Sequence, residues 1–179
     1  MKQELQRKPI QAASLIPVYR REDGDVGLVV VRRTPWGVHG GQLAFPGGKY
    51  EEEDGDLLET AVRESREEVG LARKAIHVLE ELPPLETWTT GFVIHPFLAR
   101  IERPAEWCKD DREIAQVLEI GLRDLARPDA HGEDLVTFPT WPGPRRIPYY
   151  RVGPYKLWGA SYRIFHPLLP RLLSGEWEI

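Results

Sequence analysis

The alternation of apolar and polar residues along the chain predicts β-strands on either side of one well-defined helix. Residues 11–19 and 26–33 have the pattern of strands joined by a polar turn, and the Val-rich second strand is expected to be buried on both faces. The remaining strands are expected at residues 42–45, 75–82, 92–101 and 114–120, and a hairpin is expected from residues 135–138 and 147–152.

Two segments are expected to be helical. Residues 56–69 have apolar side chains at helical spacing, with Asp54 or Asp56 as the N-cap and Gly70 at the position of a left-handed C-terminal cap. Residues 158–173 are expected to form a closing helix, limited or kinked by its prolines.

The order of these elements predicts the fold class. Strands and helices are mixed, and short turns join several neighbouring strands, so we expect an α/β (α+β) protein with a mixed, partly antiparallel sheet. A chain of 179 residues suits a single domain over residues 1–179.

Composition and charge narrow the function classes. The formal net charge is -4, from 24 basic and 28 acidic residues, which disfavours a nucleic-acid binder that relies on a basic surface. The chain has one cysteine, so it forms no intramolecular disulfide, and this suits a reducing compartment. No apolar run approaches the ~20 residues of a membrane span. We therefore expect a cytoplasmic protein that does not bind a membrane.

The helix expected at residues 56–69 carries a compact group of carboxylates. On a helix, Glu64, Glu67 and Glu68 fall within roughly 100° of one another, beside the apolar stripe. Glu64 and Glu68 repel each other at i and i+4, and Mg²⁺ would remove this repulsion. Arg63 could hold Glu67 through paired hydrogen bonds. The alternative is a solvated acidic face, but a glycine- and proline-rich segment at residues 34–55 precedes the helix and favours a binding site.

Loop and helix together, residues 47–71 (GGKYEEEDGDLLETAVRESREEVGL), resemble the Nudix box. Asp54 stands where the motif has its first glutamate, with one extra residue before Arg63, and Ser65 replaces an aliphatic residue. The residues that match the motif are Gly48, Arg63, Glu64, Glu67, Glu68, Gly70 and Leu71.

Two further stretches resemble the coenzyme A pyrophosphatase branch of Nudix hydrolases. Residues 32–48 (RRTPWGVHGGQLAFPGG) are similar to its upstream extension, and residues 156–164 (KLWGASYRI) are similar to part of its closing helix. The resemblance covers about residues 11–173. It implies a Nudix-type α/β/α sandwich.

The resemblance also implies a mechanism. Mg²⁺ or Mn²⁺ would be bound by Glu64, Glu67 and Glu68, with the Gly47 carbonyl as a further ligand, and water would attack one phosphorus of a diphosphate. For coenzyme A or acyl-CoA the products would be 3',5'-ADP and 4'-phosphopantetheine. The general base stays open between Glu64 and Glu113. The residues expected to take part in catalysis are Arg63, Glu64, Glu67 and Glu113.

The glycine-rich segment supplies the expected substrate contacts. Arg32, Arg33 and Lys49 flank it and could bind phosphate, although basic residues at strand ends are often only solvated. His39 could contact substrate or hold the loop in place. Gln42 and Gly48 belong to the stretch that matches the motif and are expected to line the substrate site.

Three functions remain open at this point. The first is hydrolysis of coenzyme A or its thioesters, and the second is hydrolysis of ADP-ribose, NADH or a dinucleoside polyphosphate. The third is a Nudix module that senses a nucleotide without cleaving it, which the intact Arg63-Glu64 and Glu67-Glu68 pairs oppose. The expected partner is a small-molecule nucleoside diphosphate derivative, and a homodimer is an open alternative to a monomer.

Overall fold

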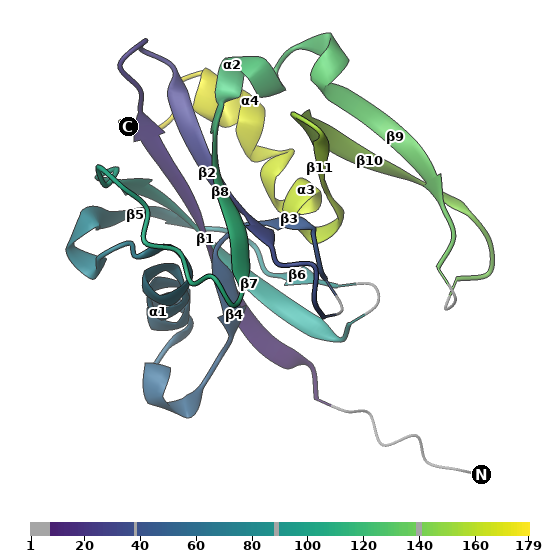
Figure 1. Ribbon diagram of the computed structural model, residues 1–179, viewed down its shortest axis with the longest axis horizontal. Coiled ribbons are helices and arrows are strands. Elements are labelled where there is room, and N and C mark those ends of the chain that lie inside the picture. The colour runs from purple at the N-terminus through teal and green to yellow at the C-terminus, as the bar shows by residue number, and fades with distance from the viewer. Residues whose placement is uncertain (1–7, 38, 88–89, 139–140) are drawn as a thin grey trace.

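The computed structural model describes residues 8–37, 39–87, 90–138 and 141–179. Within these residues eight strands form one sheet in the order β3-β2-β1-β7-β5, with β4 paired to β1, β6 to β7 and β8 to β2 (Figure 1). The strands of this sheet are β1 (Ile10–Arg20), β2 (Val26–Arg33), β3 (Leu43–Ala44), β4 (Gly47–Lys49), β5 (Ile76–Glu81), β6 (Leu85–Glu86), β7 (Phe92–Ile101) and β8 (Ile114–Gly121).

The large sheet is mixed, as the sequence predicts. β1 and β7 run parallel, from the pair Ile10 and Phe92 to the pair Val18 and Arg100. The other pairings of this sheet are antiparallel. The central strand β1 therefore contacts β7 on one side and both β2 and β4 on the other, which places the glycine-rich strand β4 beside the middle of the sheet.

A second, antiparallel sheet forms from the C-terminal third in the order β11-β10-β9. Its strands are β9 (His131–Val136), β10 (Arg145–Val152) and β11 (Tyr155–Trp158). The expected hairpin is present, but its first strand lies at residues 131–136 rather than 135–138. The closing helix expected over residues 158–173 is divided at Pro167 into α3 (Gly159–Phe165) and α4 (Leu168–Leu173), as its prolines suggested, whereas Trp158 belongs to β11.

The helix α1 (Leu57–Val69) agrees closely with the prediction. Asp56 is the N-cap and its side chain accepts a hydrogen bond from the backbone N–H of Glu59. Gly70 ends the helix in the left-handed conformation, with φ of 74°, and its N–H donates to the carbonyls of Ser65 and Arg66. Of the two candidate caps, Asp54 is thus free for another role.

Short helical turns complete the described chain: η1 (Glu52–Asp54), η2 (Arg73–Ala75), α2 (Leu122–Leu125) and η3 (Pro128–Ala130). Within the described residues, none of the helices has both the length and the apolar character that crossing a bilayer requires.

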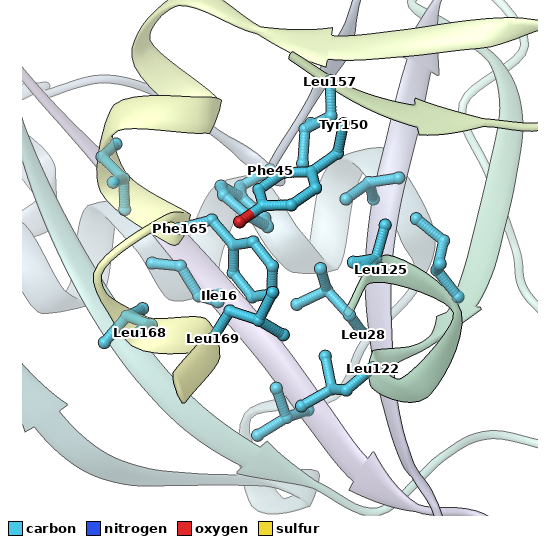
Figure 2. Close-up of a cluster of buried hydrophobic side chains, with 14 of the residues drawn as sticks. Ile16, Leu28, Phe45, Leu122, Leu125, Tyr150, Leu157, Phe165, Leu168 and Leu169 are labelled. Atoms are coloured by element: carbon cyan, nitrogen blue, oxygen red, sulfur yellow. The ribbon is translucent and has the colours of Figure 1, made fainter. Parts of the chain in front are cut away.

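Hydrophobic clusters lie on both faces of the large sheet. One cluster packs Ala61, Val62 and Val69 of α1 against residues such as Leu15 of β1. The other packs the second sheet and helices α2–α4 against the opposite face, where Ile16, Leu28, Phe45 and Phe165 meet (Figure 2). Helices thus cover both faces, which agrees with the expected α/β/α sandwich.

Candidate active site

Glu68 lies deep inside the protein and is only 2% exposed. Its Oε2 accepts a hydrogen bond from the backbone N–H of Gly47 at 3.1 Å, and its Oε1 accepts one from Nη2 of Arg33 at 2.9 Å. Burial raises the pKa of Glu68 to about 7, and the nearby Arg33 opposes this rise. The helix α1 and the strand β4 therefore meet at a carboxylate that burial makes costly to ionise.

Glu64 lies one turn earlier on α1 and packs against β4. A Cβ added at Gly48 would lie 2.2 Å from Oε1 of Glu64, so any larger residue there would force the Glu64 carboxylate to move. Burial raises the pKa of Glu64, Arg63 opposes the rise, and the charges of Glu67 and Glu113 add to it. The acidic groups thus lie close enough to disfavour one another's ionisation.

Arg63 is held by a carboxylate whose role the sequence left undefined. Its Nε and Nη2 donate to Asp54 at 2.5 and 3.1 Å, and Nη2 also donates to the carbonyl of Lys49 at 3.1 Å. Asp54 also accepts bonds from the Thr60 hydroxyl and the Glu51 N–H. The Arg63 hydrogen bond contributes most to lowering the pKa of Asp54 to about 2. Asp54 is therefore a positioning residue.

Arg63 connects this anchor to the acidic group. Its Nη1 donates to Glu64 at 3.0 Å and to Glu67 at 3.2 Å, the second being the contact expected from the i, i+4 spacing. The Glu67 side chain remains 50% exposed. The fixed guanidinium thus orients two carboxylates on one side of α1.

The fit of this arrangement to a divalent cation depends on how its carboxylates are paired. Within the described part of the chain, no three His, Cys, Asp or Glu side chains form a ready-made metal cluster. The carboxylates are instead neutralised by arginines. Glu113 is exposed and acts electrostatically on both Glu64 and Glu68. The charges of Glu67 and Glu113 raise the pKa of Glu64, and those of Glu64 and Glu113 raise the pKa of Glu68. Oxygen donors that repel one another in this way suit a hard cation, and Glu64, Glu67 and Glu68 are the groups that could hold it.

The two arginines of β2 point to opposite faces of the sheet, because side chains alternate along a strand. Arg33 reaches Glu68 on the α1 face. Arg32 lies with its guanidinium 5.0 Å from the ring centre of Tyr155 in the second sheet. Sequence reasoning treated both arginines as phosphate contacts, but the structure brings only Arg33 to the carboxylates and the adjoining cavity.

A cavity of about 600 Å³ opens beside β4. The expected substrate residues Arg33, His39, Gln42, Gly48 and Lys49 line it, and the Gly47 backbone links it to Glu68. Sequence reasoning missed its other wall, for which the only signal was the Trp-Gly-Ala stretch at residues 158–160. The residues of this wall include Phe138, Trp141, Ile147, Trp158, Arg163 and Ile164.

Comparison with known proteins places this geometry in context. The model of the NUDIX domain matches residues 8–140. A Yersinia enterocolitica protein called "Uncharacterized Nudix hydrolase NudL" is 37% identical over 116 residues, which are 65% of this chain and 58% of the relative. A Salmonella newport protein of the same name is 38% identical over 112 residues, 63% of this chain and 57% of the relative. The chain thus spans less than two thirds of these relatives.

Solved structures agree with the fold. A MutT/nudix family protein from Enterococcus faecalis has a TM-score of 0.61 at 17% identity and covers 95% of this chain and 66% of its own. A NUDIX hydrolase from Alicyclobacillus acidocaldarius has a TM-score of 0.59 at 20% identity, and the match covers 67% of this chain and 82% of that protein. The family match, the fold and the Arg63-centred carboxylates agree, and the chain belongs to the Nudix family.

Proposed function

We propose that this protein is a Mg²⁺- or Mn²⁺-dependent hydrolase that cleaves the diphosphate bond of a nucleoside diphosphate derivative. The observation that carries the proposal is the approach of Glu64 and Glu68 to the glycine strand β4, at the edge of a cavity lined by Arg33 and Lys49. Buried carboxylates suit a cation, and the neighbouring basic side chains suit phosphate.

The residues of the site divide the work as follows. Glu64 and Glu68 would hold the cation with help from Glu67, and Asp54 keeps Arg63 in position against them. When bound, a divalent cation polarises the phosphoanhydride and lowers the pKa of its water. Glu113 is the better candidate to accept a proton, because Arg63 already occupies the Glu64 carboxylate and Glu113 is exposed.

The substrate we propose is coenzyme A or an acyl-CoA, cleaved to 3',5'-ADP and 4'-phosphopantetheine. The support is that residues 32–48 and 156–164, which resemble the coenzyme A pyrophosphatase branch, both contribute to the cavity. ADP-ribose, NADH and dinucleoside polyphosphates are the competing substrates, because one fold hosts many specificities.

The test is a substrate panel with products identified by mass. Purified protein with Mg²⁺ or Mn²⁺ is incubated with coenzyme A, an acyl-CoA, ADP-ribose, NADH and a dinucleoside polyphosphate. Glu68→Gln should lose turnover by roughly a hundredfold or more. Glu59→Gln is the matched control, since Glu59 lies on the same helix and, among the described residues, forms its ion pair with Arg73 at the surface.

Two outcomes would contradict the proposal. Near-normal turnover by Glu68→Gln would overturn the assignment of the metal ligands. Tight binding of these nucleotides without turnover would instead identify a sensing module.

A further inference from the structure

The cavity is lined by a positively charged side chain, Arg163, that the proposed diphosphate chemistry does not use. Arg163 lies on α3 and lines the cavity, and its Nη1 donates to the backbone carbonyl of Glu86 at 2.9 Å. Burial lowers the pKa of the Arg163 guanidinium, so its charge is partly removed from water. A desolvated guanidinium strengthens any hydrogen bond to an anion that enters the cavity.

The sheet register places Arg163 far from the glycine strand. Lys49 on β4 is opposite Ala12 on β1, which is opposite Ile94 on β7, which in turn pairs with Leu85 on β6. These positions span three strand spacings, or about 14 Å at roughly 4.8 Å each. Glu86, to which Arg163 is anchored, follows Leu85. The guanidinium is therefore placed for an anionic group other than the diphosphate beside β4.

The cavity that Lys49 and Arg163 both line also has an aromatic wall. The ring centre of Phe138 lies 4.6 Å from the ring centre of Trp141 and 6.2 Å from that of Trp158. All three residues line the cavity. Among the described lining residues none is acidic. Aromatic faces stack on nucleobases of any sequence, and the absence of carboxylates there avoids repulsion of a phosphorylated nucleoside.

We infer that Arg163 binds a phosphate monoester on the ribose of the substrate's nucleoside, and so selects nucleoside diphosphate derivatives that carry this additional phosphate. The inference rests on the proposed function, because it assigns the nucleoside half of the substrate to the cavity. The planar guanidinium can donate two parallel hydrogen bonds to a phosphate, which lysine cannot reproduce. Such a monoester occurs on the 3' position in coenzyme A-type ligands and on the 2' position in phosphorylated nicotinamide dinucleotides.

Direct binding tests this without hydrolysis. Isothermal titration calorimetry compares adenosine 3',5'-bisphosphate, adenosine 2',5'-bisphosphate and adenosine 5'-monophosphate. The wild-type protein should bind one bisphosphate at least roughly tenfold more tightly than the monophosphate, as expected for a charge-assisted hydrogen-bonded pair. The preferred bisphosphate identifies the position of the phosphate. Arg163→Gln should remove the preference, whereas its affinity for the monophosphate should change less than about twofold.

The controls separate a binding role from a structural one. Arg151→Gln makes the same chemical change on an exposed position of β10 and should keep the preference. Arg163→Lys should restore only part of it. Equal affinity of the wild-type protein for the bisphosphates and the monophosphate would overturn the inference, even if Arg163→Gln does not fold. A preference retained by Arg163→Gln would also overturn it.

The outcome is independent of the proposed hydrolysis. A phosphate preference in a protein that cleaves none of the panel would sustain the inference and contradict the proposed function. Cleavage of coenzyme A and dephospho-coenzyme A with the same kcat/KM would sustain the function and contradict the inference.

Discussion

Replacing Asp54 by Asn tests how strongly the anchor of Arg63 stabilises the fold. The Asp54 side chain is only 3% exposed, and it accepts bonds from Arg63 Nε at 2.5 Å and from the Thr60 hydroxyl at 2.8 Å. Asn keeps the shape of the side chain but removes the charge that faces Arg63. The change therefore probes electrostatics with little alteration of packing.

The magnitude follows from the pKa of Asp54, which is about 2 in the fold against a reference value of 3.8. A pKa difference of one unit between the folded and unfolded states corresponds to about 1.36 kcal/mol. Ionised Asp54 therefore contributes on the order of 2 kcal/mol to the free energy of unfolding. Screening at the nearby solvent edge reduces this to about 1–2 kcal/mol. Because the folded pKa is depressed, the contribution is fully present above pH 3.8 and is lost as the pH falls through about 2.

Urea unfolding of wild-type and Asp54→Asn protein at pH 7, 5 and 3 measures this contribution. We expect Asp54→Asn to be less stable by about 1–2 kcal/mol at pH 7 and 5, and by roughly half of that at pH 3. Asp111→Asn is the control, because Asp111 is 86% exposed and contacts only Lys109 among its described ion-pair partners. A variant as stable as wild type at pH 7, or a deficit that does not shrink at pH 3, would refute the reasoning.

Two further predictions concern the carboxylates. Gly48→Ala should lower kcat/KM at least roughly tenfold, because the added Cβ would lie 2.2 Å from Oε1 of Glu64 and displace that carboxylate. Steady-state kinetics measures this loss, and an unchanged kcat/KM would contradict a role of Glu64 in the reaction. Added Mg²⁺ should raise the Tm of the wild-type protein but not of Glu68→Gln. The pKa of Glu68 is raised to about 7, so its contribution to the stability of the metal-free fold is lost as the pH rises through 7. Below pH 7 a proton competes with the cation for the Glu68 carboxylate. Differential scanning fluorimetry should therefore give a larger Mg²⁺ effect at pH 8 than at pH 6, and an equal effect at both would contradict this.

The helix α1 could be predicted because its signals are local. The cap at Asp56, the glycine at residue 70 and the apolar stripe act within a few turns, and the structure confirms a helix at residues 57–69 against the expected 56–69. The same spacing brings Glu64 and Glu68 to one side of the helix. How Asp54 acts on Arg63 was not predicted, because a residue between a turn and a helix has no periodic pattern that shows its direction.

The two arginines of β2 show where a local pattern is insufficient. Alternation along a strand requires Arg32 and Arg33 to face opposite sides, but it does not say which side α1 covers. β2 is apolar on both faces, so burial gave no further indication. The choice of Arg33 depends on the packing of α1 against β1, which is a contact between segments distant in sequence.

The C-terminal third was the least predictable part for a related reason. Residues 155–158 become strand β11 because they pair with β10, while Gly159 begins α3 with φ of 64° and Pro167 separates α3 from α4. Apolar spacing alone predicted one helix over residues 158–173, limited or kinked by its prolines, and did not show that Trp158 belongs to a strand. This segment matters for the site. The carboxylates lie within residues 8–140, which the NUDIX domain model matches, whereas Trp158 and Arg163 of the other cavity wall lie beyond them. Within our proposal, cleavage and the choice of substrate are thus assigned to different segments of the chain.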